Sequence, residues 1–321
     1  MDSISAEKPR GMQVWILAAR PRTLFAAAGP VLMGLALAAA DGTFHVPSAA
    51  ASLICALLLQ IGANYVNDFS DGVRGADSAG RLGPPRAVQS GWTTPRAMRR
   101  AAMGVLMLAF LTGLYLVYRG GWLLLVLGLL AIASAIFYTA GPFPLGYYGI
   151  AEPFVFVFFG PVAVAGTYCV QSGEWSPEAL AAGCGPGLLS VALLTVNNIR
   201  DLPQDHVTGK RTLAVRLGDT FARIFFVGCV GIALTVPPWL GVWLKGISAQ
   251  AAFLFTGGTG VLLAPLAVRL IRDVWNDTGR ALNRSLARTG LLIFAYSVIF
   301  SAAWLLLFGF SHGHELGGLD I

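Results

Sequence analysis

Two short polar segments carry the residues of this sequence that are best suited to chemistry. The first contains Asp68 and Asp71, and the second contains Asp201 and Asp205. On a helix, residues three or four positions apart lie on one face, so each segment would present two neighbouring carboxylates. Like charges at that spacing repel unless a cation lies between them, and Mg²⁺ prefers hard oxygen ligands. The spacing therefore predicts a divalent metal site.

Basic residues follow both pairs of acids. They are Arg74, Arg81, Arg86, Lys210 and Arg211. Such side chains bind phosphate oxygens, and Mg²⁺ held by one or two carboxylates keeps positions for phosphate, so together these groups indicate a diphosphate site. A simpler interpretation, that each arginine is a solvated loop cation, stays open for any single arginine. It is weaker for the aspartates, because acidic residues contribute little to membrane topology.

The composition indicates which elements must position these residues. Of 321 residues, 56% are hydrophobic and only 12% are charged, whereas soluble domains have about 25% charged residues. Apolar runs near the spanning length of about 20 residues predict an all-α membrane protein, with about nine transmembrane helices in a bundle around a central cavity. The runs are residues 23–40, 47–66, 101–117, 121–138, 149–170, 179–196, 224–244, 251–268 and 290–310.

The basic residues also predict the orientation of the chain in the membrane. All Lys and Arg except Arg119 and Lys245 lie in the N-terminal segment or after the second, sixth and eighth runs. Short cytoplasmic loops collect such residues, so the N-terminus and both acidic segments are expected in the cytoplasm and the C-terminus outside. This distribution explains the net charge of +6 without nucleic acid. We expect one domain over 1–321, with a flexible segment 1–14 and a short tail 311–321.

The two acidic segments end apolar runs at equivalent positions on the same membrane side. This arrangement predicts two pseudo-equivalent halves that face each other across the cavity. An apolar cavity below a metal and diphosphate site suits a prenyl diphosphate taken from the lipid bilayer. The expected chemistry is ionisation of the allylic carbon–oxygen bond, followed by attack of an aromatic acceptor on the carbocation.

At these residues the sequence resembles the UbiA-type intramembrane prenyltransferases over essentially its whole length, and within them the branch that acts on 1,4-dihydroxy-2-naphthoate. The stretches that carry the resemblance are Ala19-Arg-Pro-Arg-Thr-Leu24, Asn67-Asp-Phe-Ser-Asp71, Gly83-Pro-Pro-Arg86 and Asn197-Asn-Ile-Arg-Asp201, the last continuing to Gly218. The resemblance implies polyprenyl transfer to that acceptor, giving demethylmenaquinone for menaquinone biosynthesis. It also implies two Mg²⁺ ions that bridge the diphosphate, and a location in the cytoplasmic membrane of a prokaryote.

By the resemblance, Asp68, Asp71, Asp201 and Asp205 are the catalytic residues and metal ligands, with Asn67 and Asn198 nearby. The predicted substrate-binding residues are Asn64, Asn67, Arg74, Asp77, Arg81, Arg86, Tyr138, Glu152, Asn197, Asn198, Lys210 and Arg211. Glu152 is included because an ionisable side chain in an apolar run is functional by default. Its alternative is an interfacial carboxyl bonded to Tyr147 or Tyr148. Tyr138 could shield a carbocation, or simply be an interfacial aromatic residue.

Two alternative functions stay open. Sister branches carry a Tyr-Pro-x-x-Lys-Arg type motif after the fourth span, where this sequence reads Tyr138-Thr-Ala-Gly-Pro-Phe-Pro-Leu145 without a basic residue. This departure disfavours acceptors such as 4-hydroxybenzoate, which, with homogentisate, is the first alternative. The second is a secondary transporter, which would bind its substrate near the membrane midplane, whereas these acids lie at helix ends.

Overall fold

Every regular element in the residues that the structure describes is a helix. This computed structural model describes residues 9–75, 81–244, 250 and 257–309, so the predicted site residue Asp77 lies outside it. The helices are α1 (Met12–Ala19), α2 (Pro21–Ala40), α3 (Val46–Arg74), α4 (Pro95–Gly120), α5 (Trp122–Phe137), α6 (Leu145–Tyr148), α7 (Ala151–Phe159), α8 (Pro161–Ser172), α9 (Pro177–Val207), α10 (Leu213–Leu217), α11 (Asp219–Leu244), α13 (Gly258–Asn276), the 3₁₀ turn η2 (Gly279–Ala281) and α14 (Leu282–Phe308).

Local sequence signals fix where the long helices begin. Thr94 accepts a hydrogen bond from Ala97 N, and Ser176 accepts one from Ala179 N. Each cap is followed by a proline in the first turn, where the missing N–H costs nothing. The same kind of signal therefore starts both long helices, α4 at the end of the bundle where α3 stops and α9 at the opposite end.

Where the structure describes them, the predicted apolar runs lie mainly on helices, and the chain is an integral membrane protein. Seven stretches among the described residues are long and apolar enough to span a bilayer. They are α2, α3, α4, the broken pair α7 and α8, α9, α11, and η2 with α14. α5 is shorter, with 16 residues, and α13 carries Arg269, Arg272 and Asp273. The count of nine spans therefore stays a prediction.

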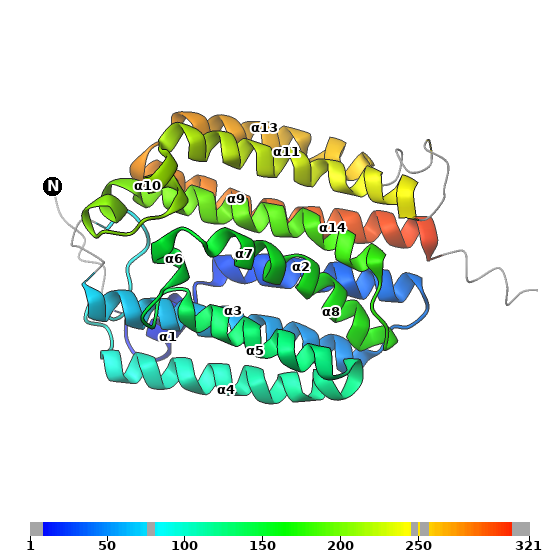
Figure 1. Cartoon of the computed structure of the whole chain (residues 1–321), viewed down its shortest axis with the longest axis horizontal. Helices are drawn as coiled ribbons and strands as arrows, with labels where there is room; N and C mark the ends of the chain where they lie inside the picture. Colours follow the sequence, from blue (N-terminus) through cyan, green and yellow to red (C-terminus); the bar gives the residue numbers. More distant parts are fainter. Residues whose placement is uncertain (1–8, 76–80, 245–249, 251–256, 310–321) are drawn as a thin grey trace, which may run out of the picture.

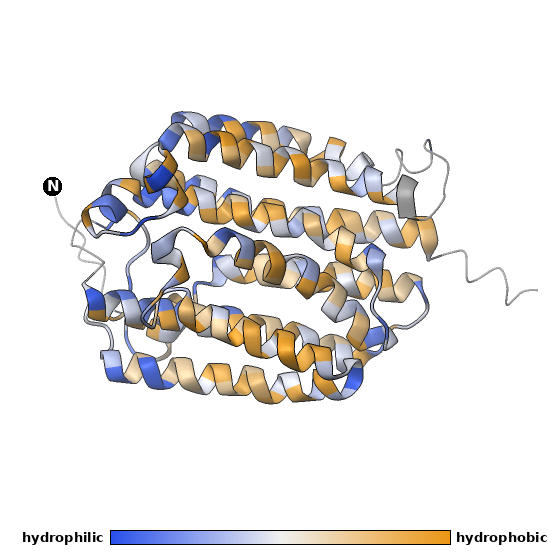
Figure 2. Cartoon of the chain, in the orientation of Figure 1, coloured by the Kyte–Doolittle hydropathy of each residue, from blue (hydrophilic) through white to orange (hydrophobic). Residues whose placement is uncertain are grey.

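The helices lie side by side along one direction, and α3 and α9 end at the same end of the molecule (Figure 1). Hydrophilic residues gather at that end, while the middle of the bundle is largely hydrophobic (Figure 2). Buried apolar residues form two clusters, one built mainly by α2, α8, α9, α11, α13 and α14, the other by α1, α3 and α4. α3 contributes to the smaller hydrophobic cluster and α9 to the larger one. The acidic ends of the two helices therefore lie near the boundary between the two clusters. The predicted equivalence of two halves stays a prediction.

The N-terminal segment becomes ordered earlier than expected. The sequence analysis placed residues 1–14 in a flexible segment, but α1 begins at Met12. Val14 and Ala18 are buried in the smaller cluster, and the Tyr65 hydroxyl donates to Trp15 O over 3.0 Å. The apolar helix α1 therefore packs against α3, a contact that composition alone does not reveal.

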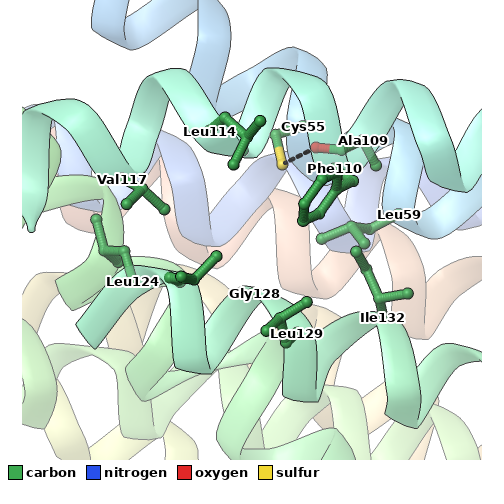
Figure 3. Close-up of a pocket in the computed structure, with 12 residues that line it drawn as sticks. Cys55, Leu59, Ala109, Phe110, Leu114, Val117, Leu124, Gly128, Leu129 and Ile132 are labelled. Atoms are coloured by element: carbon green, nitrogen blue, oxygen red, sulfur yellow. Dashed lines mark hydrogen bonds between the residues drawn. The ribbon is translucent and has the colours of Figure 1, made fainter. Parts of the chain in front are cut away.

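An apolar pocket between α3, α4 and α5 contains one of the four cysteines. Cys55 donates to Ala109 O over 3.5 Å, and leucine, phenylalanine and isoleucine side chains surround it (Figure 3). All four cysteines, which lie in the described part of the chain, are free thiols. This pocket offers packing surface and no chemistry of its own.

The break between α7 and α8 lets the chain approach α9 closely. A Cβ on Gly183 of α9 would lie 2.6 Å from both Pro161 N and Pro161 Cα. Backbone atoms cannot move aside as a flexible side chain can, so only glycine fits there.

We expect Gly183→Ala to lower the free energy of unfolding by about 1–3 kcal/mol, as overpacking does. Gly104→Ala on α4 is the matched control, because nothing lies within 4 Å of its added Cβ and alanine favours helix. Thermal unfolding of the purified proteins in detergent measures both. Equal unfolding temperatures for the two variants would contradict the close contact.

Candidate active site

The acidic residues lie at the two helix ends that the sequence predicted. Asp68 and Asp71 are on the last turns of α3, and Asp201 and Asp205 are on the last turns of α9. Asp68, Asp71 and Asp205 are buried, at 1%, 1% and 6% exposure. Buried carboxylates are stable only when charges or hydrogen bonds compensate them. Their partners therefore define what each acid does.

Asp71 and Asp205 face each other across one lysine. Lys210 Nζ lies 3.8 Å from Asp71 Oδ1 and 4.0 Å from Asp205 Oδ1. The turn that follows α9 brings this about, because Lys210 N donates to Asp205 O over 2.9 Å and Gly209 adopts a positive φ of 73°. One carboxylate from each cluster of helices thus meets a common cation.

Tyr147 of α6 closes this group of charges on one side. Its hydroxyl donates to Asp71 Oδ1 over 2.9 Å, and Lys210 Nζ lies 4.6 Å from its ring centroid. Burial and the negative charge of Asp71 raise the pKa of the Tyr147 hydroxyl, so it stays protonated and remains a donor at neutral pH. Tyr147 O also accepts from Arg211 N over 2.7 Å, which ties α6 to the chain after α9.

Three guanidinium groups gather near the same acids. Arg86 is buried, and its Nη2 lies 2.5 Å from Asp71 Oδ2. Burial and the charge of Arg86 lower the pKa of Arg20 to about 10 and that of Arg81 to about 9. Both remain cations at neutral pH. Such crowded positive charge beside two carboxylates favours a multiply charged anion.

Arg20 is held in an uncommon backbone conformation. Among the described residues it is the one non-glycine residue with a positive φ, at 52°. Thr23 N and Thr23 Oγ1 both donate to Arg20 O over 2.9 Å. Asn64 Nδ2 donates to Ala19 O over 2.9 Å and to Thr23 Oγ1 over 3.0 Å. The predicted substrate residue Asn64 thus fastens the turn that presents Arg20, and strain of this kind concentrates at functional sites.

Asp68 has backbone partners instead. Ala87 N donates to Asp68 Oδ2 over 2.8 Å, and Val88 N donates to Asp68 Oδ1 over 2.9 Å. The residue before Ala87 is Arg86, the partner of Asp71. In this structure Asp68 therefore holds the loop that delivers Arg86 to the site.

Asp201 is paired within its own helix. Arg200 Nε lies 2.7 Å from Asp201 Oδ1, and Arg200 Nη2 lies 2.6 Å from Asp201 Oδ2. Arg200 also donates to Asn197 Oδ1 over 2.7 Å and to Asn283 Oδ1 over 3.0 Å. Asn283 Nδ2 in turn donates to Leu82 O over 2.8 Å, which connects α14 and α9 to the loop after α3. Asn197 thus orients Arg200.

The other predicted polar residues form two pairs below these charges. Asn198 Nδ2 donates to Glu152 Oε1 over a long 3.5 Å, and both residues are buried. The partner of Glu152 is thus an amide of α9, where the sequence analysis considered Tyr147 or Tyr148. Asn67 Oδ1 accepts from Thr139 Oγ1 over 2.8 Å, directly after Tyr138 at the end of α5.

Arg74 and Arg211 lie at an exposed pocket beside Tyr147. Arg74 is exposed, and its Nη2 donates to Gly141 O over 2.6 Å. Arg211 is exposed as well, and both arginines line a pocket of about 600 Å³ together with Tyr147. The adjacent residues Lys210 and Arg211, which the sequence analysis grouped together, therefore face different spaces.

The donor set around Lys210 fits one small divalent cation. Within the described residues no group of three or more His, Cys, Asp and Glu side chains comes together. Mg²⁺ commonly uses one or two carboxylates and completes its shell with water and substrate phosphate, so Asp71 and Asp205 suffice as protein ligands. Asp68 and Asp201 already have strong partners in this conformation.

The family of the chain follows from a match that covers most of its helices. A model of the UbiA prenyltransferase family matches residues 27–298, a range that contains α3, α9 and all four aspartates. The chain belongs to the UbiA prenyltransferase family.

Curated relatives of this UbiA family member share much of its length. It is 39% identical to a 1,4-dihydroxy-2-naphthoate octaprenyltransferase of Mycobacterium tuberculosis over 297 residues, which cover 90% of this chain and 96% of the relative. It is 41% identical to the protein of that name from Escherichia coli over 217 residues, or 66% of this chain and 70% of the relative. The family resemblance seen in the sequence is confirmed.

Solved structures confirm the fold of this UbiA protein. A UbiA homologue from Aeropyrum pernix superimposes with a TM-score of 0.64 at 18% identity, covering 88% of this chain and 97% of the other. A UbiA homologue from Archaeoglobus fulgidus, bound to DMAPP and Mg²⁺, gives 0.61 at 14% identity, covering 92% and 98%. At these identities the likeness is one of fold.

Sequence reasoning did not select three residues that the fold brings into or around the site. Arg20, Tyr147 and Asn283 contact or surround the predicted residues, yet Arg20 counted only toward topology and the family resemblance, with no role in the predicted site. The Arg-Pro-Arg-Thr stretch was the available signal for Arg20. Asn283 carries no local signal, because its partners are far away in the sequence.

We expect Asp68→Ala to destabilise the protein by about 1–3 kcal/mol, since it leaves two buried amides of the loop without an acceptor. Thermal unfolding in detergent and hydrogen exchange at Ala87 and Val88 measure the effect. A variant with unchanged unfolding and exchange, but a raised Mg²⁺ requirement, would show that Asp68 is a metal ligand and no anchor of the loop.

Proposed function

We propose that this protein transfers a polyprenyl group from an allylic prenyl diphosphate to 1,4-dihydroxy-2-naphthoate at the junction of α3 and α9. The observation that carries the proposal is the shared position of Asp71, Asp205 and Lys210, with Arg20 and Arg86 beside them. The names of several relatives, which are 30–41% identical, support this acceptor and a role in menaquinone biosynthesis.

The basic and the acidic residues have different roles in binding the diphosphate. Lys210, Arg86 and Arg20 supply charge-assisted hydrogen bonds to phosphate oxygens, whose negative charge grows as the allylic carbon–oxygen bond breaks. Asp71 and Asp205 would hold Mg²⁺, which neutralises the diphosphate and makes it a better leaving group when bound. Tyr147 keeps Asp71 in place by its hydrogen bond. The geometry supports one ion between these acids, and the second predicted ion would need Asp68 or Asp201 to release its partner.

The transfer itself exchanges one bond for another. The electron pair of the allylic carbon–oxygen bond leaves with the diphosphate, and the freed carbon accepts a pair from a ring carbon of the acceptor. The ring then regains its aromatic character when this carbon loses what it carried before the attack, either a proton or, at the carboxylate-bearing carbon, carbon dioxide. The apolar helices exclude water, which would otherwise capture the cation.

The same proposal sets the location of the protein. Its bacterial relatives and apolar helices support the cytoplasmic membrane of a prokaryote, with the N-terminus and the active-site loops in the cytoplasm and the C-terminus outside. Nucleic acid has no part in it. The basic residues then serve both topology and phosphate binding.

The test uses the full-length protein purified in detergent. We expect Mg²⁺-dependent prenylation of 1,4-dihydroxy-2-naphthoate, abolished by EDTA and restored by added Mg²⁺, with products identified by mass spectrometry. The assay includes prenyl diphosphates of several chain lengths, and 4-hydroxybenzoate and homogentisate as competing acceptors. Comparable rates with all three acceptors would contradict the assigned acceptor, and unchanged rates in EDTA would contradict the metal.

A further inference from the structure

The pocket of about 600 Å³ beside Tyr147 is lined by neither of the acids Asp71 and Asp205 nor by Lys210. It lies between the loop after α5, the short helix α6 and the turn after α9. Its volume falls in the range of about 300–1,000 Å³ that is usual for small-molecule sites. The pocket is therefore large enough for an aromatic substrate.

Two guanidinium groups give this pocket its charge. Arg74 is fixed by its bond to Gly141 O, and its Cζ lies 5.1 Å from the Tyr147 ring centroid. Arg211 is anchored through its backbone amide to Tyr147 O, which leaves its side chain at the pocket. Arginine presents a planar fork of donors that matches a carboxylate and stacks on aromatic faces.

The remaining lining consists of two glycines, two prolines and two tyrosines. Gly141 and Gly209 adopt positive φ values of 80° and 73°, which a residue with a Cβ would reach only with strain. Pro142 and Pro144 stiffen one wall, and the rings of Tyr147 and Tyr148 provide aromatic surface. Such walls favour a planar aromatic molecule over a flexible chain.

One side chain is common to this pocket and to the acidic site. Tyr147 lines the pocket, and its hydroxyl donates to Asp71. Lys210 Nζ lies 4.6 Å and Arg74 Cζ 5.1 Å from its ring centroid; Lys210 contacts the two acids, whereas Arg74 lines the pocket. A ligand in the pocket would approach the site along Tyr147.

We propose that Arg74 and Arg211 bind the carboxylate of the aromatic acceptor in this pocket, separately from the diphosphate. This inference rests on the proposed function, because an acceptor with a carboxylate must exist. It reassigns two arginines that the sequence analysis placed on the phosphates. Phosphate is the poorer occupant here, because the proposed diphosphate site uses Lys210 and Arg86 beside Asp71, neither of which lines this pocket.

Binding can be measured without turnover. Isothermal titration calorimetry uses the full chain in detergent, without prenyl diphosphate, and two probes: 1-hydroxy-2-naphthoate and its carboxylate-free counterpart 1-naphthol. We expect Arg74→Gln and Arg211→Gln each to weaken binding of the naphthoate about tenfold, the lower range for a hydrogen-bonded charge, and to leave 1-naphthol unchanged. Arg272→Gln, an exposed cation on α13, is the control and should bind both probes as the unaltered protein does.

A kinetic arm separates this inference from the proposed function. In the prenylation assay, the same two variants should raise the KM for the acceptor about tenfold while the KM for prenyl diphosphate stays unchanged. A rise in the KM for prenyl diphosphate instead, or displacement of the naphthoate by inorganic diphosphate, would overturn the carboxylate assignment. The assignment would also be overturned if Arg74→Gln and Arg211→Gln bound 1-hydroxy-2-naphthoate in calorimetry as tightly as the control variant Arg272→Gln does. If the unaltered protein binds naphthoate by these arginines but transfers no prenyl group, the proposed function fails and this pocket stands.

Discussion

Asp71→Asn and Asp205→Asn are each expected to reduce turnover by about a thousandfold. This is the upper end of the loss that follows removal of one preorganised electrostatic group. Both substitutions keep the size of the side chain, so packing at the ends of α3 and α9 should survive. Each removes one of the two carboxylates that face Lys210 and leaves a neutral amide where a divalent cation needs a charged oxygen ligand. Turnover of the detergent-purified variants at saturating substrates and Mg²⁺ measures the loss.

The control for these variants is Asp273→Asn. Asp273 pairs with Arg288 between α13 and α14, outside the acidic ends of α3 and α9. We expect that variant to retain turnover near that of the unaltered protein. Similar activity in all three variants would refute the role of Asp71 and Asp205, and loss in only one of them would show that the metal or diphosphate is held by one helix alone.

Lys210→Met is expected to raise the KM for prenyl diphosphate or lower turnover by about 10- to 100-fold. A charge-assisted hydrogen bond to phosphate contributes about 1.5–3 kcal/mol, which sets this range. Methionine keeps much of the length and the apolar stem of lysine, so the contact with the Tyr147 ring is largely preserved. The measurement is a titration of prenyl diphosphate at fixed acceptor, with membrane insertion checked for each variant.

The matched control neutralises two cations that serve topology. Arg280 and Arg284 are exposed, and their connection contains no carboxylate pair. We expect the double change Arg280→Gln and Arg284→Gln to leave both kinetic constants close to those of the unaltered protein. Equal and small effects of the lysine and arginine changes would show that the loop cations only orient the chain and that the acids and Mg²⁺ hold the diphosphate unaided.

The sequence by itself determined the helices and the residues with chemical potential. Apolar runs fixed where helices form, because spanning length and hydropathy are local properties. Thr94 and Ser176 marked the starts of α4 and α9 in the same local way. The three- and four-residue steps from Asp68 to Asp71 and from Asp201 to Asp205 placed each pair on one helix face. All four acids do lie at the ends of α3 and α9.

Only the tertiary structure decided which of these residues act together. Within each pair the acids found different partners: Asp71 and Asp205 share Lys210, while Asp68 binds loop amides and Asp201 binds Arg200. These choices depend on the path of the loop after α3 and on how α3, α6 and α9 pack. The spacing of residues along one helix contains no information about either.

The same reason explains why Lys210 and Arg211 separate and why Arg20 joins the site. Neighbours in a turn point to different sides once Gly209 and Tyr147 fix its backbone, so adjacency in sequence predicted a shared role that the fold does not give. Arg20 lies near the acids at a left-handed turn that Thr23 holds locally and Asn64 holds from α3. Periodicity and composition describe each helix alone, whereas a site made by several helices is set by the contacts between them.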